Sequence, residues 1–181
     1  MEQLPRHGKK QDLSIPEEPL HLIKTANSFL PSGGIIVRPP SYGGKVVYEG
    51  ELGIVIGKTC SGVPGDRADD HIFGCTCIND VTAIEIINND PSFPQWSRAK
   101  SMDTFGVFGP VVAAGIDPSG LSIRTVLNGY ERQNYPVRDM IHPPRRIVSS
   151  IQGFDAVSGR CHRLRHVGGR GLHEGDPQTN Q

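Results

Sequence analysis

Two glutamates, Glu49 and Glu51, stand two residues apart in the apolar stretch VVYEGELGIVIGK, which covers residues 46–58. Side chains alternate between the two faces of a β-strand, so a strand here would point both carboxylates the same way. The run continues as GIVIG, which is typical of a strand interior, so water would reach this face poorly. Like charges this close repel each other and lose hydration energy unless a cation or hydrogen-bond donors compensate.

Three interpretations of this pair are open from the residues alone. The strand could lie at a sheet edge with both carboxylates in water, or each glutamate could pair with a nearby arginine or lysine. Alternatively, the two carboxylates could hold a divalent cation together with at least one further oxygen ligand. The E-x-E spacing by itself does not choose among the three.

Two later segments offer further polar groups. Asp80 closes the apolar run FGCTCIND, where we expect a strand to give way to a short helix. An aspartate there could cap the helix, which is a frequent use of this residue, or it could supply the further oxygen ligand. Downstream, AKSMDTFGVFGP carries Lys100 and Thr104 among small and turn-forming residues, a pattern that also suits an ordinary loop.

The elements that must position these side chains are predicted to be mostly strands. The chain contains 22 glycines and 15 prolines, and its apolar runs are short. Short apolar runs separated by glycine and proline favour a β-rich domain, with short helices over residues 80–88 and 144–150. With 181 residues, 36% of them hydrophobic, the chain is long enough for one compact domain with a sizeable core.

Composition also limits the classes of partner. Lys and Arg together number 19, as do Asp and Glu, so the formal net charge is zero and no global field recruits nucleic acid or an anionic membrane. The four cysteines form no C-x-x-C pair, which favours reduced thiols in a cytoplasmic protein. No apolar run approaches the roughly 20 residues of a membrane span, so we expect no membrane partner.

Taken in order, the E-x-E pair, the strand-closing IND and the segment AKSMDTFGVFGP closely resemble the fumarylacetoacetate hydrolase family. The branch is the small-domain one, which includes acylpyruvate hydrolase-like and 2-hydroxyhepta-2,4-diene-1,7-dioate isomerase-like proteins. The match runs from PEEPLHLIKTANSFLPSG, which begins at Pro16, to about Ser150. The resemblance implies a β-rich α+β fold, a mixed β-sandwich roll that usually forms a homodimer.

The resemblance also implies roles for individual residues. Glu49, Glu51 and Asp80 would bind Mg²⁺ or Mn²⁺, and Lys100 and Thr104 would line the substrate site, with Lys100 acting in catalysis. The implied substrate is a small 2-oxo or 2-hydroxydienoic acid from the breakdown of aromatic compounds. The implied reaction is C–C bond hydrolysis or keto–enol isomerisation through a metal-stabilised enolate. The alternative is an inactive member of the family that only binds metal or dimerises.

The chain departs from the family pattern after Asp80 and at both ends. It reads AIEII where hydrolytic relatives read approximately A-R-D-x-Q, which places Ile87 where a polar side chain would meet substrate and favours the isomerase-like branch. Residues 1–15 lack the family's lid motif with its histidine and glutamate, so we expect a truncated N-terminus. The predicted division is therefore an N-terminal segment over 1–15, the family domain over 16–150, and an aberrant, disordered tail over 151–181.

The predicted tail is dense in Arg, His and Gly and has no apolar periodicity, which suits disorder or a basic nucleic-acid-binding tail. A third interpretation is a change of reading frame. One allowed codon choice for residues 160–172, read one base later, encodes DVIACGTSVGVG, which contains the family's G-T-x-x-G-V-G element. On this interpretation the basic residues are accidents of frame, and we expect no nucleic-acid partner.

We therefore predict a frameshift near Ser150. Sequencing the gene tests this, because the codons for residues 151–172 must be compatible with the shifted reading. Codons that cannot encode the family elements in another frame would contradict it.

Overall fold

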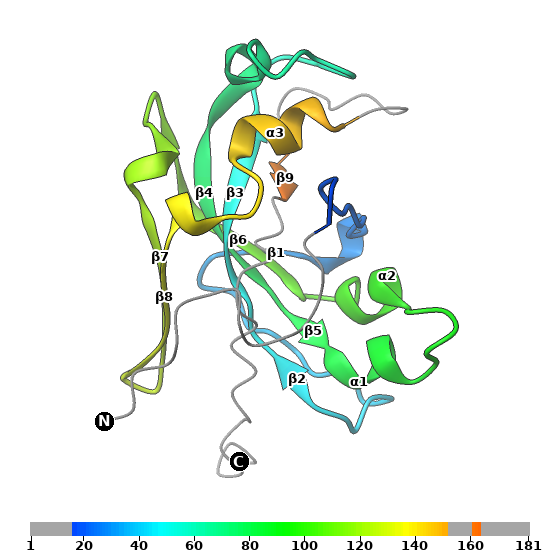
Figure 1. The fold of residues 1–181 in the computed structure, drawn as a ribbon. Helices are drawn as coiled ribbons and strands as arrows, with labels where there is room; N and C mark the ends of the chain where they lie inside the picture. The colour runs from blue at the N-terminus through cyan, green and yellow to red at the C-terminus, as the bar shows by residue number, and fades with distance from the viewer. Residues whose placement is uncertain (1–15, 152–160, 164–181) are drawn as a thin grey trace.

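Strands make up most of the regular structure in the computed structural model, which describes residues 16–151 and 161–163 (Figure 1). The strands are β1 (Phe29–Pro31), β2 (Val46–Val47), β3 (Gly50–Ile56), β4 (Ile72–Asp80), β5 (Thr82–Ala83), β6 (Gly106–Ala114), β7 (Ser122–Leu127), β8 (Tyr130–Pro136) and β9 (Cys161–Arg163). The α-helices are α1 (Ile84–Asn88), α2 (Trp96–Lys100) and α3 (Pro144–Ser149). Single 3-10 turns are η1 (Ala26–Ser28), η2 (Ala68–His71), η3 (Pro118–Gly120) and η4 (Val137–Asp139).

The main sheet has five strands in the order β1-β6-β4-β3-β9. Strand β1 runs parallel to β6, and the other neighbours in this sheet are antiparallel. Two smaller antiparallel pairs accompany it, β2 with β5 and the hairpin of β7 and β8. The prediction of a β-rich α+β domain with a mixed sheet is confirmed.

Strand β3 lies at the centre of the largest core cluster. Its residues Leu52, Ile54 and Ile56 point to one face, as alternation along a strand requires, and are buried there. Helix α3 covers this face, as Figure 1 shows, and contributes Ile147 and Val148 to the same cluster. The short helix predicted over residues 144–150 is thus observed, and its apolar side chains explain why it packs on β3.

A second group of elements consists of the strand pair β2 and β5 and the helices α1 and α2. The pair β2 and β5 lies beside α1 and α2 (Figure 1), and a cluster of Val47, Ile84, Ile87 and Ala99 joins β2 to the two helices. The residue before α1 that occupies the N-cap position is Ala83, so Asp80 does not cap this helix. Asp80 is instead the last residue of β4, where its side chain is available for other contacts.

Several predictions about the ends of the chain fall on residues that the structure does not describe. Residues 1–15 and most of 151–181 lie outside the described part. The predictions of an N-terminal segment without the family's lid motif, of a disordered tail and of a frameshift therefore stay predictions. Within the segment predicted to be disordered, β9 pairs antiparallel with β3, opposite Gly53–Val55 in register. Among the helices of the described residues, none is long and apolar enough to span a membrane.

Candidate functional site

The three acidic residues singled out from the sequence come together in space. Glu49, Glu51 and Asp80 each offer a carboxylate oxygen, and these atoms all lie within 4.8 Å of one another. Glu51 is 4% exposed and Asp80 is fully buried. An edge strand with both carboxylates in water is therefore the wrong interpretation of the E-x-E pair.

The pairing of β3 with β4 explains how Asp80 reaches the two glutamates. Gly50 is opposite Asn79 in the antiparallel register, so the residues that flank the start of β3 face the end of β4. The Asp80 amide donates a hydrogen bond to the Glu49 carbonyl at 2.8 Å, and the Asn79 side-chain oxygen accepts from the Glu49 amide at 3.2 Å. Asp80 is thereby held against the residue that begins the E-x-E motif.

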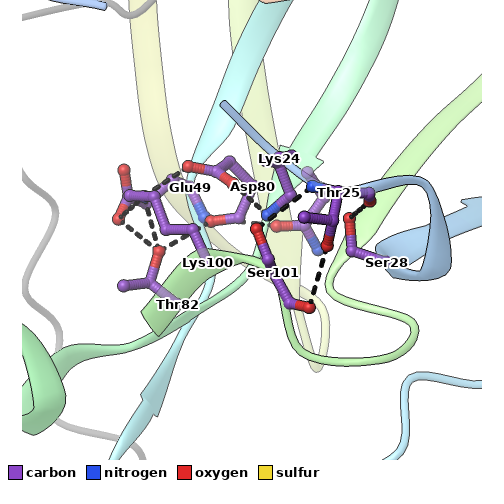
Figure 2. A network of polar contacts seen from close by, with 9 residues as sticks. Lys24, Thr25, Ser28, Glu49, Asp80, Thr82, Lys100 and Ser101 are labelled. Atoms are coloured by element: carbon purple, nitrogen blue, oxygen red, sulfur yellow. Dashed lines mark hydrogen bonds and ion pairs between the residues drawn. The ribbon is translucent and has the colours of Figure 1, made fainter. Parts of the chain in front are cut away.

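Lys100 places its ammonium group among these carboxylates (Figure 2). It is the last residue of α2 and is fully buried. Its Nζ donates to Glu49 Oε1 at 2.9 Å, to Thr82 Oγ1 at 2.6 Å and to Asp80 Oδ2. An ammonium group has three donors, so these three acceptors match its capacity. The ion-pair interpretation of Glu49 is thus observed, and the predicted placement of Lys100 at the carboxylates is found.

Lys24 is a second cation at the site, and the sequence reasoning gave it no role. Its Nζ lies 2.6 Å from Asp80 Oδ1, and the side chain is 8% exposed. Asp80 therefore contacts one lysine through each carboxylate oxygen. Lys24 belongs to the segment PEEPLHLIKTANSFLPSG, which resembles the family. The available signal was a lone lysine that directly follows the apolar pair Leu22 and Ile23.

Polar contacts join the segment after Lys24 to the loop after Lys100. The Thr25 amide donates to Ser101 Oγ at 3.1 Å, and the Asn27 side chain donates to the Ser101 carbonyl at 3.0 Å. Figure 2 shows Thr25 and Ser101 directly beside Lys24. These bonds hold both lysine-bearing segments in place around Asp80.

Thr104 lies further along the same loop, and its backbone is in the left-handed region with φ at 68°. Its hydroxyl oxygen accepts a hydrogen bond from the Val37 amide at 2.8 Å. This contact orders the backbone around Val37 against the loop. The role of Thr104 in lining a substrate site stays a prediction.

Tyr48, next to Glu49 in the chain, adds no anion to the site. Burial raises the pKa of its phenol above the ordinary value, and the nearby positive charge of Arg132 acts in the opposite direction with a smaller effect. The phenol is therefore neutral at neutral pH. The negative charge at the site comes from the carboxylates.

The donor set is the kind that a hard divalent cation requires. Carboxylate oxygens are the preferred ligands of Mg²⁺ and Mn²⁺, and three of them converge here. Glu49, Glu51, Asp80, Lys24 and Lys100 together carry one more negative than positive charge when all are ionised. A divalent cation at this cluster would therefore meet a net negative site.

We predict that Lys100→Met destabilises the metal-free protein. The substitution leaves buried carboxylates without the ammonium that contacts them, and breaking a buried ion pair costs about 3–5 kcal/mol. Urea unfolding in the presence of EDTA should show this loss in the free energy of unfolding. Lys58→Met, at an exposed position, is the matched control and should change little. A Lys100→Met protein as stable as the control would contradict the structural role of this ammonium.

Comparison with known proteins places this geometry in a family. The family model described as fumarylacetoacetate hydrolase C-terminal matches residues 2–157. Protein MJ1656 of Methanocaldococcus jannaschii is 38% identical over 145 residues, which are 80% of this chain and 60% of that protein. Oxaloacetate tautomerase YisK of Bacillus subtilis is 32% identical over 152 residues, or 82% of this chain and 50% of the tautomerase.

Solved structures agree with these matches. The crystal structure of 2-hydroxyhepta-2,4-diene-1,7-dioate isomerase from Mycobacterium marinum superposes with a TM-score of 0.76 at 34% sequence identity, covering 82% of this chain and 57% of that one. The chain thus spans about 50–60% of the length of these relatives. The extent of the family match, together with the shared fold, shows that the chain belongs to the fumarylacetoacetate hydrolase family.

Proposed function

We propose that this chain is the metal-binding domain of an enzyme that isomerises or hydrolyses a small 2-oxo or 2-hydroxydienoic acid. The cofactor is Mg²⁺ or Mn²⁺, held by Glu49, Glu51 and Asp80. The observation that carries the proposal is the convergence of these three carboxylates within 4.8 Å, beside the buried ammonium of Lys100. Such a cluster is costly to bury unless cations compensate it.

The chemistry follows from the charges at the site. When bound, a divalent cation supplies Lewis-acid stabilisation of negative charge on a substrate oxygen. Lys100 is a protein group that can act beside it, because its ammonium lies 2.9 Å from Glu49 Oε1 and is excluded from water. A fixed positive charge in a dry site stabilises an enolate oxygen more strongly than the same charge would in water. We assign Lys100 the role of a fixed positive charge that stabilises that oxygen through space.

Isomerisation is the reaction that the residues after Asp80 favour. Ile87, at the position where hydrolytic relatives were expected to carry a polar side chain, is 3% exposed and packs with Val47, Ile84 and Ala99. Moving a proton along an enol system needs no polar group to position an attacking water, whereas hydrolysis does. The names of two similar proteins, a tautomerase and a dienedioate isomerase, support the same choice.

The direct test is calorimetric titration of Mn²⁺ into the purified protein and into a Glu49→Gln, Glu51→Gln variant. We expect binding by the wild type and a loss of more than about 100-fold in affinity in the variant. Changes to residues behind the ligands typically cost 10–100-fold, so removing two ligands should cost more.

A Glu17→Gln, Glu18→Gln variant is the matched control, because it makes the same chemical change at two exposed positions. It should bind Mn²⁺ like the wild type. Wild-type protein that is folded and binds no Mn²⁺ would refute the proposed metal site. If Mn²⁺ binds and neither oxaloacetate nor 2-hydroxydienoic acids are turned over, the alternative of an inactive, metal-binding family member would replace the enzymatic proposal.

We also propose that the chain forms a homodimer through the outer face of β1 and β6. Phe29 and Phe108 contact each other edge to face there, and they are 52% and 40% exposed, with Val111 on β6 70% exposed. Exposed apolar side chains of this kind, when they gather on one surface, typically mark association sites. Strand β1 pairs with β6 only as far as Phe108, so a second copy could also approach the edge beyond it.

Light scattering during gel filtration should therefore give twice the chain mass of 19.7 kDa for the wild type. Val111→Asp places a charge on the proposed interface and should shift the protein to the monomer. A wild-type protein that stays monomeric at high concentration would contradict this proposal.

A further inference from the structure

Gln133 reaches from the β7–β8 hairpin to the backbone of the E-x-E motif. Its Oε1 accepts a hydrogen bond from the Gly50 amide at 3.0 Å, and its Nε2 donates to the Gly50 carbonyl at 2.7 Å. Gly50 is the residue between Glu49 and Glu51. A single side chain thus binds both backbone groups of the residue that separates two proposed metal ligands.

These two bonds satisfy the backbone groups of Gly50 on the side of β3 that faces away from β4. In an antiparallel sheet, the amide and carbonyl of one residue point to the same neighbour, and those of the next residue point the opposite way. The Glu49 carbonyl accepts from Asp80 on β4, so the Gly50 groups face the other edge. Strand β9 pairs with that edge only at Gly53–Val55. The Gln133 carboxamide therefore stands where a strand would otherwise pair with Gly50.

Thr125, opposite Gln133 in the hairpin, sets the orientation of the carboxamide. Its hydroxyl donates to Gln133 Oε1 at 2.8 Å, so this oxygen receives two donors and Nε2 is left to face the Gly50 carbonyl. The absence of a side chain at Gly50 leaves room for this contact. A Cβ there would lie 2.2 Å from Thr125 Oγ1 and 2.8 Å from Gln133 Oε1, distances that real Cβ atoms do not show.

We propose that Gln133 is a positioning residue for the metal site, holding Gly50 so that the carboxylates of Glu49 and Glu51 keep the spacing that one cation requires. The proposal rests on the metal site proposed above and adds the residue that shapes it. Small divalent cations such as Mg²⁺ accept little variation in ligand geometry, whereas Ca²⁺ accepts 6–8 oxygens in flexible arrangements. A shift of the backbone between the two ligands should therefore weaken the binding of the smaller cations more than the binding of Ca²⁺.

The test compares Gln133→Leu with Asn134→Leu, the same change of an amide to an apolar side chain at the next, exposed position of β8. Titration calorimetry with Mn²⁺ and with Ca²⁺ gives the affinities, at a temperature where urea unfolding in EDTA shows both variants to be folded. We expect Gln133→Leu to lose about 10–100-fold in Mn²⁺ affinity, the range found for residues behind metal ligands, and to lose less for Ca²⁺. Asn134→Leu should match the wild type.

A change in the ratio of Mn²⁺ to Ca²⁺ affinity is a readout that general destabilisation of a folded protein would not move. Gln133→Leu with Mn²⁺ affinity within about twofold of the wild type would overturn the positioning role while leaving the metal site intact. If the wild type itself binds no Mn²⁺, the proposed function fails first, and this inference fails with it. If Gln133→Leu does not fold, Thr125→Val is the deciding variant, because it removes one donor to Gln133 Oε1. Thr125→Val should weaken Mn²⁺ binding several-fold. Unchanged Mn²⁺ binding would overturn the positioning role.

Discussion

Three carboxylates held within 4.8 Å of one another are the constraint on which the rest of the site depends. Glu51 and Asp80 are almost completely buried, so water does not screen their charges. Lys24 and Lys100 bring ammonium groups to Asp80 from the segment before β1 and from the end of α2. The cost of burying like charges explains why four distant segments meet at this point, and why the meeting point is a natural position for a cation.

The start of β3 is held from both edges, which matters because a metal site tolerates little movement of its ligands. On one side, the backbone amide and carbonyl of Glu49 form hydrogen bonds with Asn79 and Asp80 of β4. On the other edge, the carboxamide of Gln133 takes the place of a neighbouring strand at Gly50. The apolar residues further along β3 pack under α3, so the same strand anchors the core and presents the ligands.

Much of this arrangement follows from local patterns in the sequence. The alternation of side chains along a strand was enough to place Glu49 and Glu51 on one face. The many glycines and prolines were enough to predict a β-rich domain with short helices over residues 80–88 and 144–150, where the structure has α1 from residue 84 and α3 from residue 144. The resemblance to the family added Asp80 and Lys100, and the structure places both beside the glutamates. These features depend on short stretches of chain or on ordered motifs, which a single sequence displays directly.

Other contacts had no local signature. Lys24 and Asp80 are 56 residues apart, and Gln133 and Gly50 are 83 apart, so no periodicity links them. The sequence by itself determined that the domain is β-rich, which face the glutamates share and which chemistry their oxygens suit. Only the tertiary structure decided which cations meet the carboxylates and which side chain holds the strand between them, because contacts between distant segments depend on strand register and on the packing of separate elements against one another.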